Sequence, residues 1–215
     1  MSIPVTAEAA LDPDSTALIM WDLQNGLAGK APNVAGIVSA GNRLVTAADA
    51  AGVPVFWSQH VFPPLDATPA PWLLWMMRKQ SVTDVRQLRP MLQQGSHDVE
   101  FLADLRPAPH HHVLRKSQPS LFFDTPLDSM LKVRGVRSVA VCGFATDIGV
   151  EFTVRHATAE GYHAIVVEDA CGAYAQENHD RSLGFLRSWC HVTDSATVEQ
   201  VWSRAGAVRT VPATS

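Results

Sequence analysis

The sequence predicts an α/β fold, a doubly wound and mostly parallel sheet of about six strands with helices on both faces in a Rossmann-like three-layer arrangement. Short apolar runs that contain β-branched residues alternate along the chain with segments of helical spacing. The four strongest runs are almost continuously apolar, which is typical of parallel strands that helices cover on both sides. Folds of this class place their sites outside the carboxyl ends of the strands, so we look for chemistry there.

Six segments are predicted to be strands. The strong runs cover residues 16–23, 53–58, 136–143 and 163–169, and weaker ones cover 111–116 and 190–193. Helical spacing occurs between them at residues 37–51, 126–134, 149–160 and 176–188. Several of these helices are followed by a glycine, at Gly52, Gly135 and Gly161, where a helix C-terminus favours a residue with positive φ.

Length and composition suit one domain over residues 1–215, with short N- and C-terminal extensions. The chain is 47% apolar and carries a formal net charge of −4 without a block of like charges, so neither nucleic acid nor a membrane surface is an expected partner. No stretch reaches the roughly 18 apolar residues of a membrane span, and no signal peptide is recognisable. The three cysteines, Cys142, Cys171 and Cys190, are widely spaced and odd in number, which indicates reduced thiols and a cytoplasmic location.

Residues 60–95 fit no strand–helix unit and are predicted to be an insertion after the second strand. The segment contains several prolines and then a cluster of Trp and Met residues. One interpretation is a loop and short helix that complete the core or form an oligomer contact, because such clusters most often serve packing. The other is a lid that gives a small-molecule pocket an apolar wall. Both interpretations can hold together.

Polar residues follow three of the predicted strands. Asp22 ends the first, and a carboxylate there is costly unless it is paired, so it is either structural or catalytic. Lys116 ends the segment 111–116 and can hold a neighbouring carboxylate ionised. After Gly143 the chain reads FATDIGVEFT and enters a helix near Ile148, whose N-terminus would offer N–H groups to an anion, with Thr146 or Asp147 as its cap.

Three motifs in this order resemble the isochorismatase-like, or cysteine hydrolase, superfamily. They are WDLQN around Asp22, K-x-x-x-S-x-F from Lys116 to Phe122, and GFATDIGVEFT from Gly143 to Thr153. The similarity runs from about residue 15 to residue 200. It implies an Asp-Lys-Cys triad in which Asp22 and Lys116 take the first two places. The third falls on Gly149, which has no side chain, so the covalent acyl-enzyme route of the family's amidases is closed there.

The resemblance extends to isochorismatases that have glycine at this place, and it implies vinyl-ether hydrolysis of the isochorismate type. Asp22 would be the general acid, Lys116 would position it, and the N–H groups of Ala145 and Gly149 would bind substrate. The family pattern further implies a cis peptide at Phe144-Ala145 and a homo-oligomer. A small, carboxylated substrate is expected, with no cofactor and no metal, because the second strand is followed by a lone histidine, His60. The other residues expected to contact the substrate are Gln59, Trp72, Phe122, Phe144 and Thr146.

Alternatives remain open on the sequence alone. The protein can be an amide or C–N hydrolase that uses water directly or a displaced thiol, although Cys142 reads as a buried structural residue. It can also be a non-catalytic relative that binds a small molecule, in which case Trp or Phe side chains would fill the pocket above Gly149. Gly149 itself can be natural or introduced. The three consecutive histidines His110–His112 are interpreted as an ordinary strand entry, not a metal site.

Overall fold

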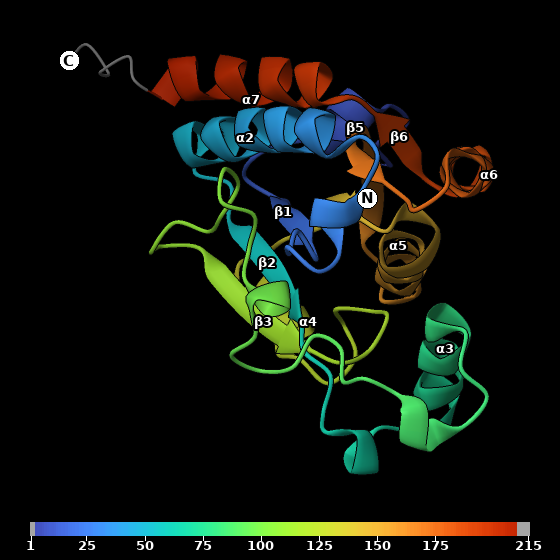
Figure 1. Ribbon diagram of the computed structural model, residues 1–215. Helices are drawn as coiled ribbons and strands as arrows, with labels where there is room; N and C mark the ends of the chain where they lie inside the picture. Colours follow the sequence, from blue (N-terminus) through green and yellow to red (C-terminus); the bar gives the residue numbers. More distant parts are fainter. Residues whose placement is uncertain (1–2, 210–215) are drawn as a thin grey trace.

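Six strands form one sheet in the order β3-β2-β1-β4-β5-β6 in the computed structural model (Figure 1), which describes the backbone of residues 3–209 and the side chains of residues 3–205. Every neighbouring pair is parallel. The chain starts in the centre, proceeds to one edge, returns to the centre and proceeds to the other, so the predicted doubly wound α/β fold is confirmed. The strands are β1 (Thr16–Trp21), β2 (Val55–His60), β3 (His112–Lys116), β4 (Ser138–Phe144), β5 (His163–Gly172) and β6 (His191–Thr193).

Helices cover both faces of this sheet. Figure 1 shows α2 and α7 lying side by side over one face, and the right-handed crossovers of parallel strands place α4 and α5 on the other. Short 3-10 turns occur at Ala28–Lys30, Leu65–Ala67, Val85–Gln87 and His97–Val99. The helices are α1 (Ala7–Ala10), α2 (Val34–Ala51), α3 (Ala70–Gln80), α4 (Leu127–Val133), α5 (Glu151–Ala159), α6 (Gln176–Trp189) and α7 (Ser195–Arg209).

The predicted element boundaries differ from the observed ones in ways that bear on the site. The second strand extends two residues further than predicted, to His60, and α5 begins at Glu151, after a π-helical turn from Thr146 to Val150. The sequence pattern did not predict α1 or α7. The glycines at 52, 135 and 161 have φ values of 73°, 68° and 90°, as predicted. Residues 1–2 and 210–215 of the predicted extensions lie outside the described residues.

Burial follows the position of each strand in the sheet. All residues of the central strands β1 and β4 are buried, as their continuous apolar runs predict, whereas β3 at the edge alternates between buried and accessible residues. The main hydrophobic core lies around these central strands. Within the described part of the chain, no helix combines the length and the apolar character needed to cross a bilayer.

The insertion after β2 has a small hydrophobic cluster of its own. The insertion contains the helix α3 and continues to the start of β3 at His112, past the predicted boundary at residue 95. Figure 1 shows α3 set apart from the layers of the sheet, on the side of the strand ends. The buried members of this cluster are Phe62, Met76, Leu88, Leu92 and Val99, and none of them belongs to the buried main core.

Candidate active site

Three buried polar side chains meet where β1, β2 and β3 end. Asp22 follows β1, His60 is the last residue of β2, and Lys116 is the last residue of β3 and is paired in register with His60. The Lys116 ammonium lies 2.6 Å from Asp22 Oδ2 and 2.8 Å from His60 Nδ1. Since all three residues are at most 6% exposed, these contacts are shielded from bulk water.

Ser58 fixes the second oxygen of the Asp22 carboxylate. The Ser58 hydroxyl accepts a hydrogen bond from the Asp22 backbone N–H at 2.8 Å, so its own proton is free to be donated to Asp22 Oδ1 at 2.5 Å. Each carboxylate oxygen therefore receives one strong donor, Ser58 on Oδ1 and Lys116 on Oδ2. Two such donors stabilise the charged form of a buried carboxylate. Sequence reasoning did not identify Ser58.

His60 has one ring nitrogen that is not used. Its Nδ1 faces the Lys116 ammonium and must accept, so the proton of the neutral ring is on Nε2. Among the described residues, that buried Nε2 has no hydrogen-bond partner. Burial, reinforced by the Lys116 charge, lowers the pKa of His60 well below its usual value. Burial also lowers the pKa of Lys116, although Asp22 opposes this effect. The ring is thus a neutral donor at neutral pH.

A narrow cavity opens beside these groups. It contains about 470 Å³ of empty space including its open mouth, which is room for water molecules. The walls are mostly apolar, with two tryptophans from α3 and Tyr174 at the mouth. The lining residues are Trp21, Asp22, Leu27, His60, Phe62, Trp72, Trp75, Leu92, Lys116, Pro119, Phe144, Ala145, Ile148, Gly149 and Tyr174.

The mouth of the cavity joins α3 to the segment after β5. The Lys79 ammonium lies 4.2 Å from the ring centroid of Tyr174 and 5.7 Å from that of Trp75, distances at which a cation is attracted to an aromatic face. Tyr174 in turn packs edge-on against Phe144. Burial and nearby carboxylates raise the pKa of Tyr174 to about 12, so its phenol is protonated at neutral pH.

The segment after β4 forms the remaining wall. The Phe144-Ala145 peptide is cis, as predicted, and Ala145 and Gly149 both line the cavity. A Cβ atom at Gly149 would lie only 1.9 Å from Nε1 of Trp21, so the indole ring already fills the space that a side chain at 149 would need. The cavity nevertheless remains open between Asp22, Lys116 and Ala145.

Three of the residues predicted to contact substrate lie elsewhere. The Gln59 amide donates to the carbonyl of Val99, and its oxygen accepts from Arg115, because successive strand residues point to opposite faces. The Thr146 hydroxyl donates to the carbonyl of Gly172 instead of capping a helix. Phe122 packs against His156 and Tyr162. None of the three lines the cavity, whereas Trp72, Phe144 and Ala145 do.

None of the three thiols lines the cavity or has the properties of a nucleophile. Cys142 and Cys171 are fully buried, and burial raises the pKa of Cys142 well above its usual value and that of Cys171 to about 12. Cys190 is partly buried, and burial raises its pKa to about 12 as well. A thiol must ionise to attack, so these residues are structural.

The residues at the end of β2 do not fit a divalent metal. Nδ1 of His60 receives the Lys116 ammonium, whose charge repels a second cation nearby. Asp22 is the single carboxylate among the residues that line the described cavity, and its two oxygens already accept from Ser58 and Lys116. A zinc-type site usually needs three protein ligands.

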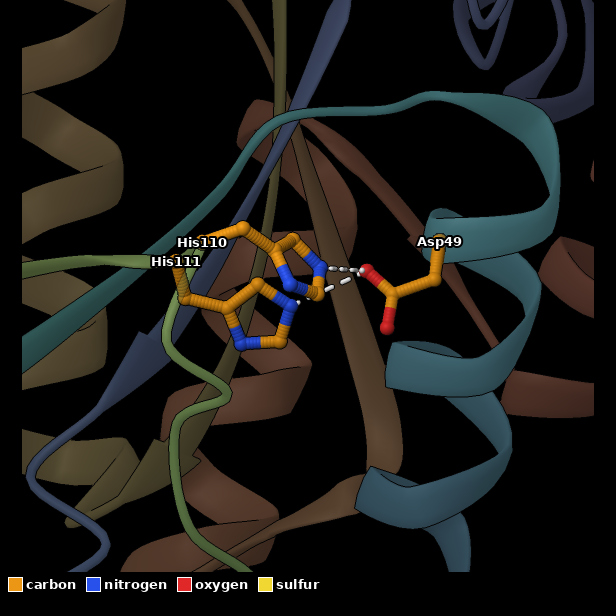
Figure 2. Close-up of side chains that lie close together, drawn as sticks. All are labelled: Asp49, His110 and His111. Carbon is orange, nitrogen blue, oxygen red and sulfur yellow. Dashed lines mark hydrogen bonds and ion pairs between the residues drawn. The ribbon is translucent and has the colours of Figure 1, made fainter.

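A second cluster of histidines and a carboxylate lies at the opposite end of the strands, near the start of β3. Figure 2 shows both imidazole rings turned toward one oxygen of Asp49, which lies 2.9 Å from His110 Nε2 and 3.0 Å from His111 Nε2. Nδ1 of His111 accepts hydrogen bonds from the Trp57 indole and the Ala108 backbone N–H. The proton of that ring is therefore on Nε2, where it is donated to Asp49 and leaves no lone pair for a metal.

Comparisons with known proteins identify the family and the fold of the chain. The family model described as "Isochorismatase domain" matches residues 16–197. A protein named ureidoacrylate amidohydrolase RutB from Methylorubrum extorquens AM1 is 35% identical over 235 residues, covering 99% of this chain and 93% of its own. A cysteine hydrolase structure from Pseudomonas syringae pv. phaseolicola 1448A matches with a TM-score of 0.81 and 27% identity, over 95% of this chain and 100% of its own. An isochorismatase family protein from Burkholderia thailandensis matches with a TM-score of 0.73 and 26% identity, over 94% and 100%.

Proposed function

Because the chain belongs to the isochorismatase family and is a hydrolase, we propose that it cleaves the C–N bond of a small amide or ureido acid with water that Asp22 activates. The observation that carries the proposal is the set of hydrogen bonds that Asp22 accepts and its position beside the cavity. Its carboxylate receives one donor on each oxygen, from Ser58 and from Lys116, and it borders a cavity that has room for water. A carboxylate can act as a general base, and a base is what direct attack by water requires.

The reaction can be written with this chain's own groups. Asp22 removes a proton from a water molecule, and the hydroxide oxygen forms a bond to the carbonyl carbon of the substrate. The carbonyl oxygen becomes an oxyanion, which the Nε2–H of His60 can stabilise because that donor has no partner among the described residues. Asp22 then returns its proton to the leaving nitrogen, the C–N bond breaks, and an acid and an amine or ammonia are released. Lys116 keeps Asp22 in place through both proton transfers.

The name of the curated relative supports the ureido class. That relative acts on ureidoacrylate according to its name, and it covers almost the whole chain. A ureido acid is compact and planar, which suits a narrow cavity between aromatic walls. The Lys79 ammonium, which lies over the ring of Tyr174 in the cavity lining, would attract the acid group of such a substrate.

A second candidate is vinyl-ether hydrolysis of the isochorismate type, which the sequence favoured. Gly149 supports it, because that reaction needs no thiol. It requires Asp22 to deliver a proton to carbon, however, and both carboxylate oxygens already accept hydrogen bonds, from Ser58 and from Lys116. We therefore favour hydrolysis of an amide or a ureido acid over hydrolysis of a vinyl ether.

A non-catalytic relative is the third candidate. Trp21 does fill the space above Gly149, which is one mark of a site that has lost its chemistry. Against this, a buried ion pair is costly to keep unless a function uses it, and the cavity beside Asp22 and Lys116 remains open.

The deciding experiment offers the purified protein ureidoacrylate and N-carbamoylglycine, with release of ammonia as the readout, and isochorismate, with release of pyruvate. We expect ammonia from a ureido acid. Pyruvate alone would support the second candidate, and neither product would leave the binding protein as the correct reading and overturn the proposal. Asp49→Asn serves as the matched control because Asp49 does not line the cavity.

Direct attack by water also predicts that no acyl group becomes attached to the protein. Intact-mass spectrometry after rapid acid quenching of a turning-over sample should show the unmodified chain. A Cys142→Ala, Cys171→Ala double variant should keep the wild-type kcat, since both thiols are buried and lie outside the cavity lining. An acylated cysteine, or loss of activity in a double variant that remains folded, would contradict direct attack.

A further inference from the structure

Trp21 and Gly149 are sterically coupled. The indole of Trp21, the last residue of β1, is almost completely buried and projects toward the π-helical turn that contains Gly149. A Cβ atom at position 149 would lie 1.9 Å from Nε1, 2.2 Å from Cε2 and 2.5 Å from Cζ2 of this ring. No pair of non-bonded atoms tolerates such distances, so Trp21 and any side chain at 149 exclude each other.

The backbone holds Trp21 in this position from the neighbouring strand. Gly143 of β4 is paired in register with Trp21 and has a φ of 130°, and a Cβ there would lie 2.1 Å from the Trp21 carbonyl oxygen. The two strands approach so closely only because position 143 is glycine. The main chain of Trp21 therefore packs directly against β4.

The same ring also contacts the Lys116 side chain. The ammonium nitrogen lies 4.1 Å from the centroid of the Trp21 ring, a distance typical of a cation–π contact, and the lysine side chain is 1% exposed. The ammonium is thereby held between the carboxylate of Asp22, the ring of His60 and the face of Trp21.

The indole N–H of Trp21 is a donor without an acceptor. Buried indole groups usually have a hydrogen-bond partner, yet the described residues provide none for this nitrogen. Nε1 is the ring atom nearest to the place of a Gly149 Cβ, and Trp21 and Gly149 both line the cavity. His60 also lines the cavity, and its buried Nε2 has no hydrogen-bond partner among the described residues.

We propose that Trp21 replaces the missing side chain at position 149 as a substrate-binding residue, with its indole N–H donating to the carbonyl oxygen of the substrate and its ring positioning Lys116. The acceptor that suits N–H donors from two residues of one cavity lining, Trp21 and His60, is the carbonyl oxygen of an amide or a urea. This inference rests on the proposed function for the identity of that oxygen, whereas the exclusion between Trp21 and position 149 does not.

The steric part is tested without activity, by a cycle of Gly149→Cys, Trp21→Leu and the double variant. Gly149→Cys alone should lower Tm by roughly 5 °C or more, because the thiol side chain meets the indole. Adding Gly149→Cys to the Trp21→Leu variant should lower Tm by much less. In this double variant, iodoacetamide should alkylate the thiol at position 149, as peptide mapping would show. Equal losses of Tm in both backgrounds, or failure to alkylate position 149 in a folded double variant, would overturn the steric exclusion between Trp21 and a side chain at 149.

The donor part is tested by Trp21→Phe, which keeps a ring beside Lys116 and removes the N–H. In the two-dimensional ¹H–¹⁵N spectrum, the signal lost in Trp21→Phe identifies the Trp21 indole. This signal should move downfield when N-carbamoylglycine is added to wild-type protein, and Trp189→Phe serves as the matched control because Trp189 is half-exposed and does not line the cavity. On a hydrolysed ureido acid, Trp21→Phe should lower kcat/KM by about tenfold.

The two proposals fail in different ways. If the indole signal shifts but no ureido acid is hydrolysed, the proposed function fails and the donor stands. If hydrolysis occurs and Trp21→Phe keeps wild-type kcat and KM, the donor role is wrong and the proposed function stands. An indole signal that no ureido or amide probe moves would also overturn the donor role.

Discussion

Two clusters of histidine and carboxylate lie at opposite ends of the strands of the same sheet, and they contain similar residues in different hydrogen-bonding states. At the carboxyl ends of the strands, Asp22 and His60 share the Lys116 ammonium. Near the start of β3, Asp49 accepts hydrogen bonds from His110 and His111 (Figure 2). The described residues satisfy both ring nitrogens of His111, whereas they leave Nε2 of His60 without a partner. A donor left unused beside a cavity marks a site better than the residue types do.

The clusters also differ in their environment. The side chain of Asp22 is 6% exposed, while that of Asp49 is 36% exposed. Burial raises the cost of removing a partner, because an unpaired buried charge cannot turn to water. The same kind of substitution should therefore have a large effect in the first cluster and a small one in the second, which can be measured.

The largest expected effect is on activity. Asp22→Asn should lower kcat on the identified substrate by a factor on the order of 10³, because the amide cannot take the proton from water. Asp49→Asn should leave kcat unchanged. Steady-state kinetics on both variants checks this, with circular dichroism to show that each is folded. Comparable losses in the two variants would mean that the cavity cluster is not the catalytic one.

The next effect is on stability. Lys116→Met leaves Asp22 buried without its counter-charge and should lower the free energy of unfolding by about 3–5 kcal/mol. His110→Ala removes one partner from a partly exposed carboxylate and should cost about 1 kcal/mol or less. Urea denaturation at pH 7 measures both values. Similar losses would show that burial does not separate the two clusters.

The smallest effect is the dependence of stability on pH. The pKa of His60 is lowered in the folded protein, so below about pH 6.5 the unfolded chain binds a proton that the folded chain does not. The unfolding free energy should therefore fall between pH 6.5 and 5, by at most about 2 kcal/mol from this residue. His60→Gln should flatten the slope in that window. For Asp49, burial raises the pKa but the hydrogen bonds from both histidines outweigh it, so its pKa is lowered and its contribution is lost only at more acidic pH.

Denaturant midpoints measured at half-unit steps of pH would separate these two windows. An Asp49→Asn variant provides the comparison, because it should retain the slope between pH 6.5 and 5. If His60→Gln keeps the wild-type slope, His60 is not the group that titrates.

The fold could be predicted because its signals are local and repeated: apolar runs for buried parallel strands and glycines at helix ends. Asp22 and Lys116 could be found for the same reason, since both stand directly after such runs. Ser58 was not singled out although it lies within the predicted strand, and His60 was considered only as a possible metal ligand because the strand was ended at residue 58. Extended to residue 60, the period of two would have placed Ser58 and His60 on one face and Gln59 on the other.

Other features have no signal in the sequence. That Trp21 fills the space beside Gly149 depends on the rotamer of one buried ring and on how closely β1 and β4 approach. The pairing of Asp49 with His110 and His111 joins residues about 60 positions apart that no motif relates. Such contacts depend on packing between elements, which periodicity does not describe.

The small hydrophobic cluster around α3 contributes to the wall of the cavity but not to the core beneath Asp22 and Lys116. Its buried residues are distinct from those of the main core that supports Asp22 and Lys116, yet Phe62 and Leu92 of this cluster also line the cavity. Substitutions there reshape the wall that meets a ligand while the sheet keeps its own packing. Substitutions confined to residues 62–99 can therefore change which ligands the cavity accepts and leave the packing around Asp22 and Lys116 unaltered.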